Sequence, residues 1–282
     1  MSRPNVVRRT VIWWFQPPTS PYVTVNFAVD ATNARAYLAR LAERGVRITL
    51  NQLVAAAIAR TLVEHPYANG RIIGERLVLA KRVGIAMPVN LLDAAGLRRE
   101  VSMATVADVD QLTLGELATR ATRTLDAERA GEPKNPLIRT MFALGEWAPQ
   151  LFFRSTLRAV DAAVNTSYLG DVLYHQIGVT TALSNVGAAT RAADGLWFRG
   201  ADIHLPQRLM QVGTFWATGA LQDEVVPVDG APAIRPILPC VLLFDHRLVD
   251  GVRGTKLVQT FAALLRDPEA AFGAEGSARI GG

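Results

Sequence analysis

The residues FDHRLVDG, Phe244 to Gly251, join an apolar segment to an amphipathic one. The segment before them is a nearly unbroken apolar run that starts at Ile237, which is typical of a strand buried on both faces. After them, leucine and phenylalanine recur at helical spacing until Pro268. The sequence therefore predicts His246 at the end of a strand and Asp250 at the start of a helix. Such a junction holds a side chain rigidly, which suits a catalytic base.

Outside this junction, predicted strands alternate with predicted amphipathic helices. Apolar residues alternate with others from Tyr22 to Val29, and a helix is expected from Thr32 to Arg44. Capping-box signals at Thr49 and Thr113, each with Gln or Glu three residues later, predict two more helices. Further strands are predicted at Leu77–Val89, Ile177–Ser184, Met210–Ala220 and Ile237–Phe244. This order indicates one α/β domain over residues 1–282, with a mixed sheet packed with helices.

Several segments in the same order resemble the catalytic domain of the acyltransferase core subunit of 2-oxo acid dehydrogenase complexes. More distantly, they resemble chloramphenicol acetyltransferase. The segments are FDHRLVDG itself, TALSNVG from Thr181, ITLNQLVAAAIARTLVEHPYANG from Ile48, RVGIAMPV from Arg82 and the hairpin sequence from Gly219 to Arg247. The resemblance implies a chloramphenicol acetyltransferase-like layered fold. It also implies a coenzyme A-dependent acyltransferase that works as a homotrimer, with each active site between two subunits.

His246 is the candidate general base. A thiol has an unperturbed pKa of about 8.5, so acyl transfer to or from coenzyme A benefits from a group that accepts its proton. The resemblance implies direct transfer through a tetrahedral intermediate, without an acyl-enzyme. Considered without its motif, His246 is equally compatible with an ordinary histidine satisfied by hydrogen bonds. A serine-hydrolase mechanism is not indicated, because the sequence contains no G-x-S-x-G motif.

Ser184 and Asp250 complete the candidate catalytic set. By resemblance, the Ser184 hydroxyl stabilises the oxyanion of the intermediate, with Thr181 as a weaker substitute; a cross-strand or turn hydroxyl is the alternative. Asp250 at a helix start is expected to cap backbone N–H groups. The resemblance adds an ion pair between this aspartate and an arginine near the N-terminus, for which Arg8 and Arg9 are candidates. Both interpretations make Asp250 a supporting residue.

The chain departs from the family pattern in an amphipathic insertion at about residues 132–176. Its residues Pro136 to Val164 mix leucine and phenylalanine with arginine. On pattern alone, a helical pair packed on the body of the protein is expected. The alternative is a lid or platform that recognises an apolar acyl group or a membrane surface.

Composition limits the remaining possibilities. The net charge is +5, mostly from dispersed arginine, which suits a solvated surface or attraction of the phosphates of coenzyme A. No dense basic run indicates nucleic acid, and His65, His175 and His204 lack metal-ligand spacing, so no metal site is expected. The lone Cys240 is expected to be a small core residue. Without a secretory signal or a membrane-spanning stretch, a cytoplasmic location is predicted.

The partners follow from the same resemblance. Acyl-coenzyme A is the expected substrate, and a lipoyl group is not carried by this sequence, so a separate lipoyl-bearing protein would have to present it. The resemblance implies that members that build larger cores end in an apolar tail that docks between trimers; the ending FGAEGSARIGG has little to dock, which predicts a trimer, the family's minimal catalytic unit. A non-catalytic scaffold of the same fold is the alternative function. A hydroxyl- or amine-acylating enzyme is less favoured, because Asp245 stands where those relatives carry a second histidine.

Overall fold

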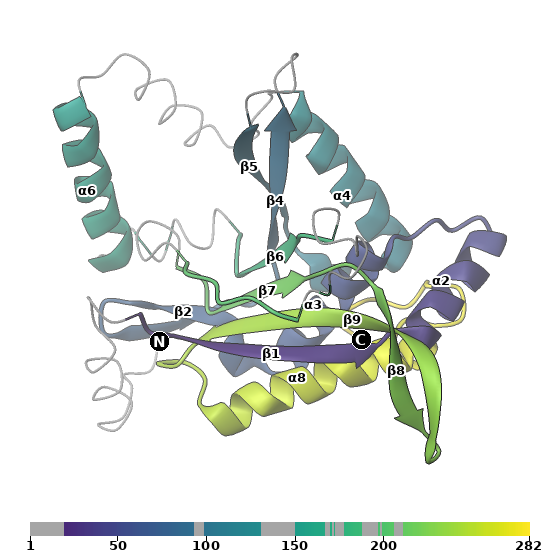
Figure 1. The fold of residues 1–282 in the computed structure, drawn as a ribbon. Helices are drawn as coiled ribbons and strands as arrows, with labels where there is room; N and C mark the ends of the chain where they lie inside the picture. Colours follow the sequence, from purple (N-terminus) through teal and green to yellow (C-terminus); the bar gives the residue numbers. More distant parts are fainter. Residues whose placement is uncertain are drawn as a thin grey trace.

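The computed structural model describes residues 20–92, 99–130, 150–166, 178–187, 199–205 and 211–282, together with positions 170, 172 and 197. The strands are β1 Tyr22–Asp30, β2 Gly70–Ile73, β3 Arg76–Leu79, β4 Ile85–Leu92, β5 Arg99–Val106, β6 Thr181–Asn185, β7 Thr214–Thr218, β8 Gln222–Val228 and β9 Ala231–Asp245. The helices are α2 Thr32–Glu43, α3 Leu50–Glu64, α4 Leu114–Arg129, α6 Gln150–Thr166, α8 Gly251–Arg266 and α9 Pro268–Phe272, with short 3-10 turns at Pro66–Ala68 and Val109–Gln111. Figure 1 shows their arrangement.

Seven strands form one sheet in the order β1-β9-β7-β6-β4-β5, with β8 paired to β9. The pairs β4–β6 and β6–β7 are parallel and the others antiparallel, so the sheet is mixed as predicted. Strands β2 and β3 form a separate two-stranded ribbon. None of the helices within the described ranges combines the length and apolar character needed to cross a bilayer.

The second half of β9, from Ile237, is buried on both faces, which confirms the prediction from its apolar run. Leu242 and Phe244 belong to the main core, together with residues of α2, α3 and α8. Val241 and Leu243 point to the opposite face and form a smaller cluster with Ala217. Figure 1 shows α8 running alongside β1 and β9 on the helical side of the sheet. The strand that delivers His246 is therefore fixed from both sides.

Both capping boxes are present. Thr49 Oγ1 accepts the N–H of Gln52 at 3.2 Å, and Gln52 Oε1 accepts the N–H of Thr49 at 2.8 Å. Thr113 and Glu116 make the same reciprocal pair at the start of α4. Each box satisfies two N–H groups that a helix start leaves free, which explains why the two helices begin where the sequence predicted.

Several predicted strand boundaries are wrong. The segment Leu77–Val89 is divided into β3 and β4, because the intervening Val83 N–H is bound by the Asp110 carboxylate at 2.8 Å instead of a neighbouring strand. Strand β6 begins at Thr181 rather than Ile177, since Gly178 has a left-handed φ of 67° that interrupts extended backbone. β7 is shorter than predicted, and β9 begins earlier, at Ala231, because β8 pairs with its first half.

One helix of the insertion, α6, lies within the described residues. Val164 near its end is buried, and Arg71 of β2 donates to the carbonyl of Gly170 at 3.1 Å just beyond it. Phe152 near its start is 59% exposed, and Figure 1 shows the helix standing away from the sheet. Within the described residues, α6 therefore contacts the body of the protein near its C-terminal end. The other half of the expected pair falls outside the described residues.

Candidate active site

His246 lies on the turn between β9 and α8, as predicted. Its backbone N–H donates to the carbonyl of Pro21 at 2.8 Å, which ties the turn to the start of β1. Its ring centroid is 6.3 Å from that of Phe244, and the side chain is half-buried. The imidazole is thus held by the core on one side and reaches the surface, as a proton acceptor for a bound thiol requires.

Asp245 and Arg247, on either side of His246, form a buried ion pair. Arg247 Nη2 lies 2.6 Å from Asp245 Oδ2, and the side chains are 8% and 2% exposed. From the sequence, Asp245 served only to distinguish two branches of the family, and no role was predicted for Arg247. One feature of the sequence could have indicated this ion pair: an acidic and a basic residue two positions apart, with apolar residues before and after them.

Asp250 caps α8. Its Oδ1 accepts the N–H of Arg253 at 2.9 Å, and its Oδ2 lies 3.8 Å from Arg253 Nε. The bond to the Arg253 N–H confirms the capping role that the sequence predicted. The carboxylate is half exposed. The two candidate partners for the further ion pair, Arg8 and Arg9, fall outside the described residues.

Ser184 lies on β6 with a half-buried side chain, and a single chain does not bring it to His246. Ser184 pairs with Ala217, and Ala217 pairs with Val241, which is five residues before His246. With strands about 4.8 Å apart and a rise of about 3.3 Å per residue, the Ser184 and His246 Cα atoms are separated by roughly 15–20 Å.

Strand alternation places Ser184 on the sheet face opposite the main helical core. Leu183 belongs to that core, whereas Ala182 belongs to the cluster on the other face. The substitute hydroxyl, Thr181, is fully buried and donates to the carbonyl of Thr214 at 2.9 Å. Ser184 is therefore the more accessible hydroxyl of the strand.

The other histidines and the cysteine lie elsewhere. His65 ends α3, where its Nε2 lies 2.8 Å from Thr260 Oγ1, and burial lowers its pKa. His204 is exposed, and His175 falls outside the described residues. Cys240 is buried, and burial raises the pKa of its thiol, so it is held as a protonated core residue. Among the described side chains, no group of three or more His, Cys, Asp or Glu is placed to hold a metal ion.

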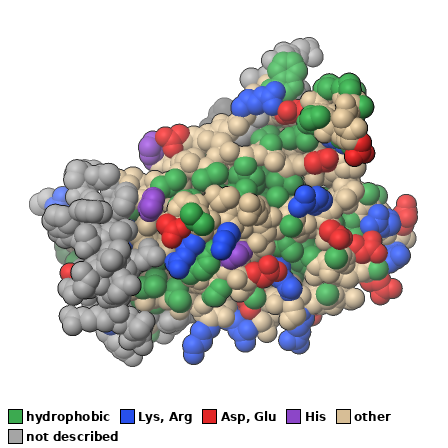
Figure 2. All heavy atoms as spheres, turned by 90° about the horizontal axis from the view of Figure 1, so that it is seen from below, with side chains coloured by type: hydrophobic (Ala, Val, Ile, Leu, Met, Phe, Trp, Pro, Cys, Tyr) green, Lys and Arg blue, Asp and Glu red, His purple; other side chains and the backbone are tan. Residues whose placement is uncertain are grey.

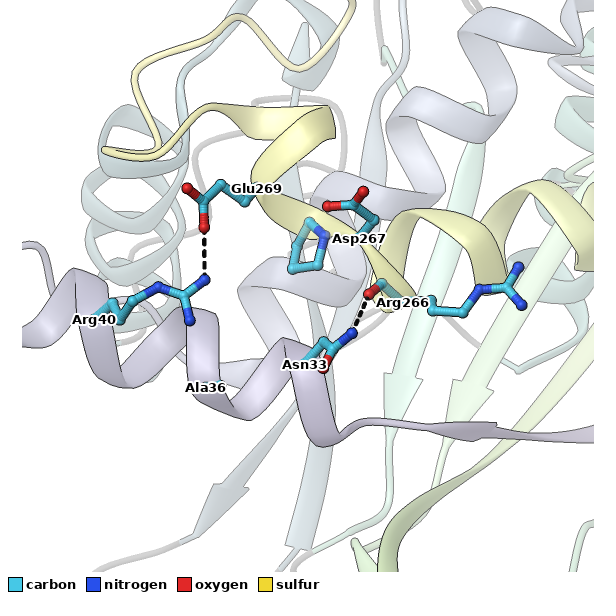
Figure 3. Close-up of a pocket in the computed structure, with 7 residues that line it drawn as sticks. Asn33, Ala36, Arg40, Arg266, Asp267 and Glu269 are labelled. Atoms are coloured by element: carbon cyan, nitrogen blue, oxygen red, sulfur yellow. Dashed lines mark hydrogen bonds and ion pairs between the residues drawn. The ribbon is translucent and has the colours of Figure 1, made fainter. Parts of the chain in front are cut away.

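Among the described residues, a hollow of about 500 Å³ lies away from the His246 turn. It lies between α2 and the junction of α8 with α9, where Arg40 binds Glu269 at 2.7 Å and Asn33 binds the carbonyl of Arg266 at 2.8 Å (Figure 3). This junction is at the opposite end of α8 from Asp250, about 24 Å away along the helix axis. Figure 2, which views the molecule from below, shows acidic and basic side chains interspersed without a single basic area.

Comparisons with known proteins agree with this architecture. The family model described as 2-oxoacid dehydrogenases acyltransferase (catalytic domain) matches residues 15–136 and 209–273, which include His246 and Asp250 but not Ser184. The dihydrolipoyllysine-residue acetyltransferase component of the pyruvate dehydrogenase complex from Staphylococcus aureus is 29% identical over 92 residues. That stretch is 33% of this chain and 19% of the relative, so the match spans about a fifth of the relative's length.

Two solved structures show the shared fold. Dihydrolipoamide acetyltransferase from Azotobacter vinelandii superposes with a TM-score of 0.60 at 20% identity, over 94% of this chain and 87% of that one. That structure was used to investigate a serine, a histidine and an asparagine four residues after the histidine in its catalytic mechanism. A chloramphenicol acetyltransferase superposes with a TM-score of 0.56 at 15% identity, over 94% and 98% of the two chains. The predicted chloramphenicol acetyltransferase-like fold is thereby confirmed.

Proposed function

The chain belongs to the 2-oxoacid dehydrogenases acyltransferase (catalytic domain) family, and from this we propose that it transfers an acyl group between coenzyme A and an acceptor thiol, with His246 as general base. The observation that carries the proposal is the position of His246. It is half-buried and stands on a turn between the buried second half of β9 and a capped helix, inside the part of the chain that matches the family. A rigid mount with surface access is what a positioned base needs.

The chemistry is a direct transfer. Neutral His246 accepts the proton of the acceptor thiol, and the thiolate sulfur attacks the carbonyl carbon of the acyl thioester. The carbonyl oxygen becomes an oxyanion, to which the Ser184 hydroxyl donates a hydrogen bond. The carbon–sulfur bond to coenzyme A then breaks, and the imidazolium returns its proton to the leaving thiolate. Atoms and charges balance without a redox step or a covalent enzyme intermediate.

The active site is shared between subunits of a homotrimer. Two features support this arrangement. The register separates Ser184 and His246 by roughly 15–20 Å in one chain, too far for both to touch one acyl group. The β8–β9 hairpin also presents Val225 and Ile234 as a cross-strand apolar pair, 70% and 73% exposed, which a neighbouring subunit would cover. His246 of one subunit and Ser184 of the next then form one site.

Asp250 supports the base without taking a proton. The Azotobacter protein places an asparagine four residues after its histidine, and Asp250 stands at the same spacing after His246. Either side chain is a good helix cap, so its role is to fix the start of α8 and the turn before it. The family relatives act on dihydrolipoyllysine, which makes a lipoyl-bearing protein the first acceptor to test.

The experiment is an acyl-transfer screen of wild type, His246→Ala and the matched control His204→Ala, whose side chain is 84% exposed. A panel of acyl-coenzyme A donors is combined with dihydrolipoamide and simple alcohols as acceptors. We expect His246→Ala to lower turnover by about 10²–10⁴-fold, the usual contribution of a general base, and His204→Ala to leave it unchanged. A His246→Ala variant as active as wild type removes the proposed base, and a wild type inactive with every donor favours a scaffold.

A further inference from the structure

The ion pair that brackets His246 is unusually complete for two residues so close in sequence. Arg247 Nε lies 2.9 Å from Asp245 Oδ1 and 3.1 Å from Oδ2, and Arg247 Nη2 lies 2.6 Å from Oδ2. The backbone N–H of Arg247 also donates to Asp245 Oδ1 at 2.9 Å. A fifth contact joins Arg247 Nη2 to the side-chain carbonyl of Gln211 at 3.3 Å. The guanidinium and the carboxylate are thus held in a single relative orientation.

The backbone on each side of the imidazole is fixed as well. Asp245 N–H donates to the carbonyl of Gly213 at 2.9 Å, and the carbonyl of Asp245 accepts the N–H groups of Leu248 and Val249 at 2.9 and 3.0 Å. His246 N–H itself is bound to Pro21. The side chains of the ion pair restrain the same turn. Together with the backbone bonds they fix the direction of the Cα–Cβ bond of His246.

Folding stability alone does not explain the buried Asp245–Arg247 pair. Two charges this deeply buried carry a large desolvation penalty, and well-packed apolar residues of similar volume often stabilise a fold equally or better. An ion pair at this position does provide what apolar residues do not, namely a defined geometry from directional hydrogen bonds. The pair also adds no net charge beside the imidazole.

We propose that Asp245 and Arg247 are positioning residues for His246: their buried ion pair aims the imidazole and keeps the electrostatic field at the ring balanced between one carboxylate and one guanidinium. This rests on the proposed role of His246 as general base. Among the described residues, the other ionisable groups near the turn include Tyr22 on β1, Arg71 on β2 and Asp250 at the start of α8. Burial, with a further contribution from Asp245, raises the pKa of Tyr22, so its phenol stays neutral.

The test is a double-mutant cycle of Asp245→Asn, Arg247→Met and the double variant, assayed for kcat, KM, the pH dependence of kcat/KM and Tm. Each single variant is expected to lower kcat at least about tenfold with little change in KM, because a misaimed base loses rate and not binding. The acidic limb of the kcat/KM–pH profile is expected to move in opposite directions in the two single variants. In Asp245→Asn, the unpaired Arg247 disfavours a positive charge on the His246 ring and moves the acidic limb to lower pH. In Arg247→Met, the unpaired Asp245 favours that charge and moves the limb to higher pH.

The double variant returns the limb close to its wild-type position while kcat stays low. Arg247→Lys, which keeps the charge but not the paired geometry, should fold and lose kcat without moving the limb, and it replaces any single variant that does not fold. The control is the half-exposed pair Arg40 and Glu269, 2.7 Å apart, changed to Met and Gln, for which no change is expected.

Two outcomes overturn the proposal and leave the function intact. One is a wild-type pH profile and kcat in all the variants, and the other is a loss of kcat that follows Tm alone with the limb unmoved in both single variants. His246→Ala is assayed in parallel to separate the two hypotheses. Activity that survives His246→Ala contradicts the proposed function itself, whereas an inactive His246→Ala beside fully active Asp245→Asn contradicts only the positioning role.

Discussion

Asp250 connects the base to the helix that follows it. Its carboxylate satisfies the N–H of Arg253 at the free end of α8, and Arg253 in turn lies over the ring of Tyr67, 4.9 Å from the centroid. The α8 start is therefore fastened to the turn after α3 as well as to the His246 turn. The cap needs only a side-chain oxygen and not a charge. Removing the capping oxygen of Asp250 and removing only its negative charge therefore have separable effects.

Asp250→Ala is expected to lower the free energy of unfolding by about 1 kcal/mol, the usual cost of losing a helix cap. Asp250→Asn keeps the capping oxygen and should cost a few tenths of a kcal/mol, since the ion pair with Arg253 is half exposed and contributes little. Denaturant unfolding of both variants measures the difference. If Asp250→Asn is as damaging as Asp250→Ala, or the loss exceeds about 3 kcal/mol, the charge is paired with a buried cation such as the one suggested for Arg8 or Arg9.

Tyr37 gives the fold a defined response to alkaline pH. Its phenol donates to the carbonyl of Gly273 at 2.7 Å, and burial raises its pKa from 10 to about 12. The folded state therefore holds this proton more tightly than the unfolded state does. The associated stability is complete below pH 10 and is lost as the pH rises from about 10 towards 12. Tm measured across this window should fall less steeply in Tyr37→Phe than in wild type; parallel curves would contradict the linkage.

Sequence patterns located His246 and Asp250 correctly because both depend on local features, a strand end and a helix start. The Asp245–Arg247 pair has no comparable signature, since an acid and a base two residues apart usually point into solvent. Ser184 was placed on the right face of a strand, but its distance from His246 depends on how β6, β7 and β9 are aligned. Strand register is a property of the whole sheet and cannot be read from one strand.

Gly254 of α8 packs directly against the ring of Phe244 of β9, and these two elements flank the base. A Cβ atom on Gly254 would lie 2.5 Å from the Phe244 ring, which leaves no room for any side chain. The absence of a side chain at Gly254 therefore lets the helix approach Phe244, two residues before His246, closely. The main core would have to open to admit even one methyl group.

Gly254→Ala is expected to destabilise the fold by about 1–3 kcal/mol, the usual cost of overpacking a tight core contact. Gly115 in α4 is the matched control, because nothing lies within 4 Å of a Cβ built there. Gly115→Ala should stabilise by up to about 1 kcal/mol through helix propensity alone. Urea unfolding of the two variants compares them directly, and a neutral or stabilising Gly254→Ala would mean that α8 does not pack on Phe244 this closely.

Helices with explicit start signals were predicted most accurately, because the capping boxes at Thr49 and Thr113 act within one turn of the chain. The boundaries of β4 and β6 could not be predicted. They are set by Asp110, which captures the Val83 N–H from a distant turn, and by the left-handed Gly178. The position of α6 was also unpredictable, since its apolar stripe does not specify which surface it meets or how much of it is covered.

Across the described residues, the two faces of the sheet carry different parts of the protein. One face carries the helices and nearly all of the main core, while the other carries small clusters and Ser184. The C-terminal segment is used within the same chain. Ile280 is fully buried and its N–H donates to the carbonyl of Leu112 at 2.8 Å.

The measurement that tests the shared active site most directly is complementation between two inactive variants. His246→Ala and Ser184→Ala chains are unfolded and refolded together at equal concentration, with each variant refolded alone as the control. If each site takes His246 from one subunit and Ser184 from its neighbour, random mixing in a cyclic trimer restores both residues in about one quarter of the sites. We predict that acyl-transfer activity recovers to about that fraction of wild type, far above either variant alone. A mixture no more active than its components, in trimers shown to have exchanged subunits, would contradict the account.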